Sequence, residues 1–180
     1  RSIPNLILSQ PKDAKEAYDL LYTAFTSGKP FCIRYPRGQA IVPETIAFDS
    51  IPIGSWTKKQ FGLQPKGIII AYGPDVERIE HTVQENEYEM IVVNARFFKP
   101  IDEHLLTSLL NLNLPIYVFE TDVTMGGLSS AILEFQNQYK NKIHILGISD
   151  HFVEHGSIRA LRKNELIDLE SLFKEIDAHG

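Results

Sequence analysis

The sequence contains a single cysteine, Cys32, which lies in the apolar run Phe31-Cys32-Ile33. No disulfide can form within the chain, so we expect a reducing compartment and predict a cytoplasmic location. The sequence also lacks any apolar run near the roughly 18 residues that a membrane helix needs, and Arg1-Ser2-Ile3-Pro4 is no signal peptide. A start at Arg1 rather than at methionine indicates a piece of a longer polypeptide.

An excess of basic residues is likewise missing. The 180 residues include 18 basic and 23 acidic side chains, a formal net charge of −5, and no basic stripe. Neither nucleic acid nor an anionic membrane is therefore predicted as a partner. The 43% hydrophobic content is typical of a globular protein, and a chain of this length can bury a full core.

Apolar runs of strand length alternate with segments of helical period along most of the chain. Strands are expected over 5–9, 31–35, 67–72, 88–94, 116–120 and 143–148, and helices over 12–25, 75–87, 102–110, 127–139, 157–163 and 168–178. Strands that alternate with helices predict an α/β fold with a mostly parallel sheet flanked by helices.

The stretch from 38 to 65 is rich in proline and glycine and shows no sustained period. We interpret 41–65 as a linker that carries a short strand around 51–57, with a first unit over 1–40 and a C-terminal domain over 66–180. Two strands and one helix bury too little surface to fold alone. The first unit must therefore dock on the C-terminal domain or on a missing N-terminal portion.

Two local patterns could hold a metal or an anion. His151-Phe152-Val153-Glu154-His155 has the spelling of an inverted zinc peptidase motif, but the flanking glycines and the Phe-Val pair favour a loop over the helix that zinc binding needs. Met125-Gly126-Gly127 precedes a predicted helix, where free N–H groups can bind an anion. A tight turn is favoured there, because the G-x-G-x-x-G fingerprint is absent. No metal ligand and no catalytic residue is predicted.

Two arginine segments follow predicted strands. Arg34-Tyr35-Pro36-Arg37-Gly38 leaves a strand where α/β sheets commonly meet small anions, and an arginine fork suits phosphate. A surface salt bridge is an equally good interpretation from spacing alone. Arg96 and Lys99 could also bind an anion, but the intervening Phe97 and Phe98 favour a packed junction.

In order and spacing, these segments resemble one family over essentially the whole chain. The segments are RSIPNL, FCIRYPRG, VVNARFFKPID, FETDVTMGGLSSAI and GISDHFVEHG. They are similar to the C-terminal third of the 1-deoxy-D-xylulose-5-phosphate synthases, which are thiamine-diphosphate enzymes of the transketolase superfamily. Transketolases and 2-oxo-acid dehydrogenase β subunits share RYPRG and RFFKPID in looser form, whereas the closing DHFVEHG favours the synthase.

The resemblance implies the tail of a pyrimidine-binding α/β domain over residues 1–40 and a transketolase C-terminal-type domain after the linker. It implies that Arg37 binds the phosphate of glyceraldehyde 3-phosphate, which condenses with pyruvate in isoprenoid precursor synthesis. Thiamine diphosphate and Mg²⁺ would belong to the full enzyme, a homodimer. Because the sequence has no Gly-Asp-Gly motif, we expect no cofactor on this chain alone and no activity without the missing N-terminal portion. The alternatives are a non-catalytic binding or assembly module built on a transketolase C-terminal-type domain, and part of a related transketolase or 2-oxo-acid dehydrogenase β subunit.

Overall fold

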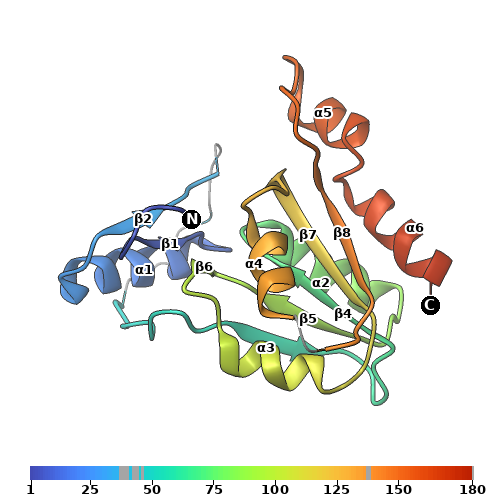
Figure 1. Cartoon of the computed structure of the whole chain (residues 1–180), viewed down its shortest axis with the longest axis horizontal. Coiled ribbons are helices and arrows are strands. Elements are labelled where there is room, and N and C mark those ends of the chain that lie inside the picture. Colours follow the sequence, from blue (N-terminus) through green and yellow to red (C-terminus); the bar gives the residue numbers. More distant parts are fainter. Residues whose placement is uncertain (37–40, 42–44, 46, 137–138, 180) are drawn as a thin grey trace.

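The structure is a computed structural model that describes residues 1–36, 41, 45, 47–136 and 139–179. It contains a three-stranded sheet and a five-stranded sheet (Figure 1). Figure 1 shows the N-terminal elements as a small body beside the larger C-terminal layers. No helix among the described residues is long and apolar enough to cross a membrane.

The small sheet combines N-terminal strands with a strand from the middle of the chain. Its elements are β1 (Ile7–Ser9), α1 (Ala14–Ser27), β2 (Phe31–Ile33) and β6 (Phe97–Lys99). The strand β1 lies in the centre, parallel to β2 and antiparallel to β6. The α1 helix begins at Asp13, whose carboxylate accepts a hydrogen bond from the Glu16 N–H, and ends at the left-handed Gly28.

The large sheet has the order β3-β5-β4-β7-β8. Its strands are β3 (Thr57–Gln60), β4 (Gly67–Ala71), β5 (Met90–Asn94), β7 (Ile116–Val123) and β8 (Ile143–Ile148). Its helices are α2 (Asp75–Glu85), α3 (Glu103–Leu110), α4 (Leu128–Phe135), α5 (Ile158–Asn164) and α6 (Leu169–His179). All neighbouring strands are parallel except β3, which is antiparallel to β5. The predicted α/β fold class with a mostly parallel sheet is confirmed.

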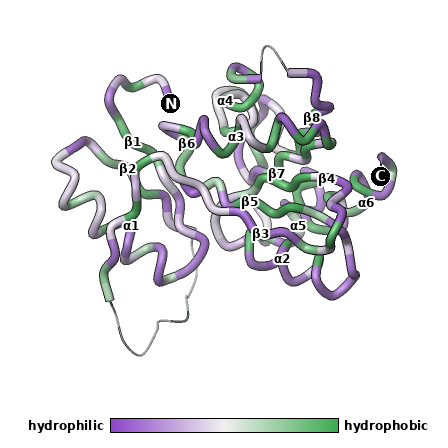
Figure 2. The backbone as a smooth tube through the Cα atoms, turned by 90° about the horizontal axis from the view of Figure 1, so that it is seen from below, coloured by the Kyte–Doolittle hydropathy of each residue, from purple (hydrophilic) through white to green (hydrophobic). Residues whose placement is uncertain are grey.

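Alternating residues of the central strands supply two separate cores, as the period of a strand requires. Ile68 and Ile70 face the core that α3 and α4 cover, whereas Ile69 faces the core that α2 and α6 cover. Both faces of β4 and β5 are buried, so apart from the closing Asn94 these strands are mostly apolar, as the hydropathy colours of Figure 2 show.

The expected strand around 51–57 is wrong in position, because β3 begins only at Thr57. Ile51 and Trp56 precede the strand, and their apolar side chains are buried in the core. The strand itself reads Thr-Lys-Lys-Gln and is exposed, as is common for a lysine-protected sheet edge. The short strand β6 was expected as a packed junction and not as a strand.

The first unit docks on the C-terminal part of the chain, one of the two options that the sequence left open. Ile7 and Leu20 belong to the same core cluster as Ile68, and Phe97 of β6 joins that cluster. The Trp56 indole N–H donates a 2.8 Å hydrogen bond to the Phe97 carbonyl and so ties the linker to this junction. The division at residues 40 and 65 stays a prediction.

Candidate functional site

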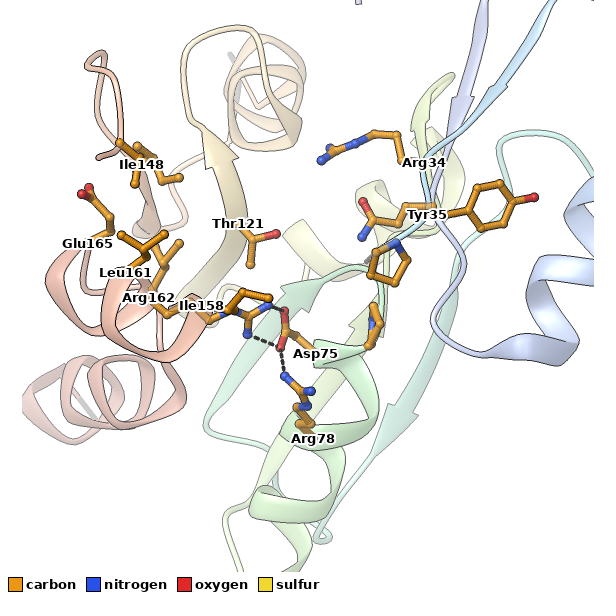
Figure 3. Close-up of a pocket in the computed structure, with 15 residues that line it drawn as sticks. Arg34, Tyr35, Asp75, Arg78, Thr121, Ile148, Ile158, Leu161, Arg162 and Glu165 are labelled. Atoms are coloured by element: carbon orange, nitrogen blue, oxygen red, sulfur yellow. Dashed lines mark hydrogen bonds and ion pairs between the residues drawn. The ribbon is translucent and has the colours of Figure 1, made fainter. Parts of the chain in front are cut away.

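The carboxyl ends of β4 and β7 meet the segment that leaves β2. The strand β4 has β5 on one side and β7 on the other, so the chain reverses direction across the sheet at β4. Ligands of open α/β sheets bind in the crevice outside such a switch point. Arg34 and Tyr35 approach this crevice from the small sheet, and Figure 3 shows their side chains pointing in different directions, as strand alternation predicts.

Arg34 is held by an ion pair to Asp122 at the end of β7. Its guanidinium carbon also lies 6.0 Å from the centre of the Tyr72 ring and 5.6 Å from that of Phe98. Cation–π contacts of this kind add to the ion pair. Both charged side chains are 38% exposed, so the pair itself contributes no more than about 1 kcal/mol. The salt-bridge interpretation therefore holds for Arg34, which links the small sheet to the end of β7.

Tyr72 completes this link with two hydrogen bonds. Its hydroxyl donates to Asp122 Oδ2 at 3.0 Å and accepts from the Thr121 N–H at 3.0 Å. Burial, with the nearby carboxylates of Asp122 and Glu120, raises the pKa of the Tyr72 hydroxyl well above its usual range. The hydroxyl therefore stays a donor at every physiological pH, and the link does not depend on its ionisation.

A cavity of about 410 Å³ is lined by Arg34, by the start of α2 and by α5 (Figure 3). Asp75, at the start of α2, is almost fully buried in its wall and receives two hydrogen bonds from Arg162 of α5, at 2.7 and 2.9 Å. Arg78 lies 3.2 Å from the same carboxylate. Paired arginines neutralise the buried charge and fasten α5 to α2.

The structure does not bring Arg96 or Lys99 into this crevice as anion ligands. Arg96 donates to Ser55 and to the buried carboxylate of Glu16, and the Lys99 ammonium donates to the carbonyl oxygens of Arg1 and Ile3. The predicted packed junction is confirmed. Arg37, the predicted phosphate ligand, lies outside the described residues, three positions after Arg34.

The Gly126-Gly127 turn contains an internal anion at the N-terminus of α4. The buried Glu120 carboxylate accepts hydrogen bonds from the Leu128 N–H, at 3.0 Å, and from the Ser129 N–H and hydroxyl. A Cβ at position 127 would lie 2.5 Å from Glu120 Oε2, so only glycine leaves room for the carboxylate. The turn is structural, as predicted, and Glu120 takes the position that an external anion would occupy.

Glu120 makes the stability of the chain depend on pH. Burial raises the pKa of its carboxyl group above the ordinary value of 4.5, although the Ser129 and Leu128 donors oppose the shift. A raised folded-state pKa gives a contribution that is complete below 4.5 and is lost as the pH rises through the folded pKa. We expect the free energy of unfolding of the native chain, relative to Glu120→Gln, to fall over the pH range above about 4.5. Urea unfolding of both proteins across this range measures it.

Glu134, in the α4 helix whose N-terminus donates to Glu120, offers a control whose pKa shift has the opposite sign. The Arg1 guanidinium lowers the pKa of the exposed Glu134 carboxyl, so its contribution is lost as the pH falls. Glu134→Gln should therefore leave the decline above pH 4.5 in place. A decline that persists in Glu120→Gln would show that another group causes it.

The predicted loop around the two closing histidines is confirmed. Residues 149–157 contain no helix, and His155 is exposed. His151 contacts Ser149 at 2.9 Å and Glu165 at 3.1 Å. Because a zinc peptidase needs both histidines on one helical face, the inverted motif does not describe this segment.

Two functional features escaped the sequence reasoning. Asp75 and Arg162 are 87 positions apart, and a helix-start aspartate alone reveals no partner at that distance. Glu120 resembles the last residue of any buried strand, but a polar residue that ends an apolar run just before a glycine turn was a signal that could have been used.

Comparisons with known proteins agree on one family. Residues 62–172 match the family model described as transketolase, C-terminal domain. The 1-deoxy-D-xylulose-5-phosphate synthase of Aquifex aeolicus is 38% identical over 98% of this chain, and the one of Bacillus licheniformis is 36% identical over 98%. The chain spans only 28% and 29% of the lengths of these relatives.

Solved structures show the same fold at low sequence identity. A split-gene transketolase, described as an inactive beta4 tetramer, superimposes with a TM-score of 0.80 at 22% identity, over 99% of this chain and 59% of that one. The transketolase of Leishmania mexicana gives a TM-score of 0.69 at 18% identity, over 97% of this chain and 25% of that one.

Proposed function

The chain belongs to the transketolase C-terminal domain family, and from this we propose that it forms the C-terminal portion of a 1-deoxy-D-xylulose-5-phosphate synthase-like enzyme. One observation carries the proposal. The chain is 38% identical, over 98% of its length, to the Aquifex aeolicus synthase, and it spans 28% of that protein. The reaction is the decarboxylative condensation of pyruvate with glyceraldehyde 3-phosphate, and the enzyme is a thiamine-diphosphate-dependent transferase in the cytoplasm.

Within that enzyme the chain supplies substrate binding and organisation. The proposed contact is between Arg37 and the phosphate of the aldehyde substrate, because a planar guanidinium binds phosphate with two parallel hydrogen bonds. Arg34 supports this role as a positioning residue: its ion pair to Asp122 fixes the strand end from which the Arg37 segment departs.

The glycine turn at the start of α4 does not fit the diphosphate of thiamine diphosphate. The glycine turn at the start of α4 is filled by the Glu120 carboxylate, which would repel a diphosphate. The chain also has no Gly-Asp-Gly motif. We therefore propose that the cofactor and Mg²⁺ are bound by the other portion of the enzyme.

An exposed apolar groove supports a missing partner portion. A cavity of about 400 Å³ between α1 and β2 is lined mainly by apolar side chains, and Phe25 in it is 82% exposed. Its wall includes Leu21, Phe31, Ile33 and Tyr35. Contiguous apolar surface of this kind marks an interaction site. We assign it to the upstream portion of the synthase, which accounts for most of the relatives' length.

A chimera tests the proposed function. The segment of the Aquifex aeolicus synthase that matches this chain is replaced by the chain, and a truncated synthase without the segment is the control. Turnover of pyruvate and glyceraldehyde 3-phosphate is expected from the chimera but not from the truncated enzyme or from this chain alone. A dimeric chimera that binds thiamine diphosphate and gives no turnover would contradict the proposal, as would synthase activity of the chain alone.

A non-catalytic module is the second candidate, and the burial of Ile7 and Leu20 within the chain's own core favours it. Native mass spectrometry of the chain isolated from cells, with thiamine diphosphate and Mg²⁺ added, distinguishes the synthase portion from the module. A complex with a larger cofactor-bearing polypeptide supports the synthase, and a lone chain without cofactor supports the module.

A further inference from the structure

Two histidines and one glutamate gather where the last helix packs beside the edge strand β8, far from the crevice. His144 lies in β8, and Glu175 and His179 lie one turn apart on α6. One ligand atom from each residue lies within 4.8 Å of the other two. The i, i+4 spacing places the two helical side chains on one face, toward the strand.

The distances between these atoms suit a small tetrahedral site. Glu175 Oε1 lies 2.7 Å from His144 Nδ1 and 3.4 Å from His179 Nδ1. Donor atoms around a tetrahedral zinc ion with bonds of about 2.0–2.1 Å are roughly 3.3 Å apart. The Glu175–His144 separation must lengthen by about 0.6 Å to match this value. The two histidine nitrogens lie within 4.8 Å of each other, and His179 is half-exposed and can turn.

The strand histidine is already held in place for one ligand atom. The His144 side chain is 8% exposed, and its ring is stacked on Tyr117 with the centroids 4.9 Å apart. Its Nδ1 faces Glu175, and its Nε2 is buried without a hydrogen-bond partner among the described residues. Burial and stacking therefore hold the ring with Nδ1 toward Glu175, and little side-chain entropy would be lost when Nδ1 gives up its proton to bind a metal.

The geometry points to a divalent metal site formed by His144, Glu175 and His179, with Zn²⁺ as the metal of best-matched chemistry. Two imidazole nitrogens and one carboxylate oxygen are a common zinc ligand set, and three protein ligands leave a fourth position for water. Such a site would bind the end of α6 to the edge strand β8. This role is independent of the proposed synthase function.

The competing explanation is a set of ordinary hydrogen bonds. His144 Nδ1 can donate to Glu175, and His179 Nδ1 can donate to the Glu175 carbonyl at 3.0 Å, which caps the end of the helix. In that case the cluster would gain nothing from zinc. The two explanations differ in affinity for the metal alone.

The test is calorimetric titration of the intact, tag-free chain with Zn²⁺, using His179→Ala and Glu175→Gln. We expect one Zn²⁺ per chain and a rise in Tm with zinc. Each variant should lose at least about 100-fold in affinity, because the loss of a mere outer-shell partner already costs 10–100-fold. Both side chains are partly exposed, so these variants should fold.

His81→Ala is the matched control. His81 pairs with Glu85 at 3.1 Å on α2 with the same i, i+4 spacing, but the described residues provide no third ligand there. It should bind zinc like the native chain. Equal affinity of His179→Ala and the native chain, or loss of binding in His81→Ala, would overturn the proposed site.

Discussion

Replacing Phe97 with alanine is expected to lower the free energy of unfolding by about 3–5 kcal/mol, the range for a buried phenylalanine. Phe97 is fully buried in the core that the small sheet shares with the large one, and its ring packs edge-on against Phe31 at 6.2 Å. Because the total stability of a domain is about 5–15 kcal/mol, this loss is severe. Urea unfolding, followed by circular dichroism, measures it.

Phe25→Ala is the matched control for this prediction. Phe25 is 82% exposed, so its removal should change the stability of the isolated chain by no more than about 0.5 kcal/mol. Within the chimera, the same substitution should weaken the assembly if the groove contacts the upstream portion. Equal destabilisation by both substitutions would mean that Phe97 does not hold the two sheets together.

The fold was largely predictable because both sheet faces are covered. The strand Gly67–Ala71 and residues 90–93 of the next strand are apolar runs, and the intervening helix α2 has an apolar stripe of Val76, Ile79 and Val83. The misplaced strand has a physical reason of its own. Ile51 and Trp56 are buried by tertiary contacts, whereas the edge strand β3 carries lysines. The hydrophobic pattern therefore placed the predicted strand over 51–57, ahead of the actual one.

The site was less predictable because its contacts join distant segments. The Arg34–Asp122 pair spans 88 positions of sequence, and strand spacing predicted only that Arg34 would lie at the carboxyl end of a strand. Likewise, the cluster of His144, Glu175 and His179 depends on how α6 packs beside β8. The sequence instead drew attention to the exposed His151 and His155, because their spacing matches the inverted zinc peptidase motif.

Replacing Arg37 with alanine in the chimera is expected to raise the KM for glyceraldehyde 3-phosphate roughly 10- to 150-fold. A charged hydrogen bond contributes about 1.5–3 kcal/mol, and 1.4 kcal/mol corresponds to a factor of about ten. The KM for pyruvate should barely change, because pyruvate carries no phosphate. Steady-state kinetics with each substrate varied in turn measures the two values.

Arg37→Lys and Arg159→Ala make this prediction specific. Lysine keeps the charge but loses the planar fork, so the KM for the aldehyde should lie between those of the native and alanine proteins. Arg159 is exposed on α5, and its loss should leave both KM values unchanged. If Arg37→Ala impairs both substrates equally, Arg37 is a structural residue. Its effect would then resemble that of breaking the Arg34–Asp122 ion pair, which holds the chain just after β2.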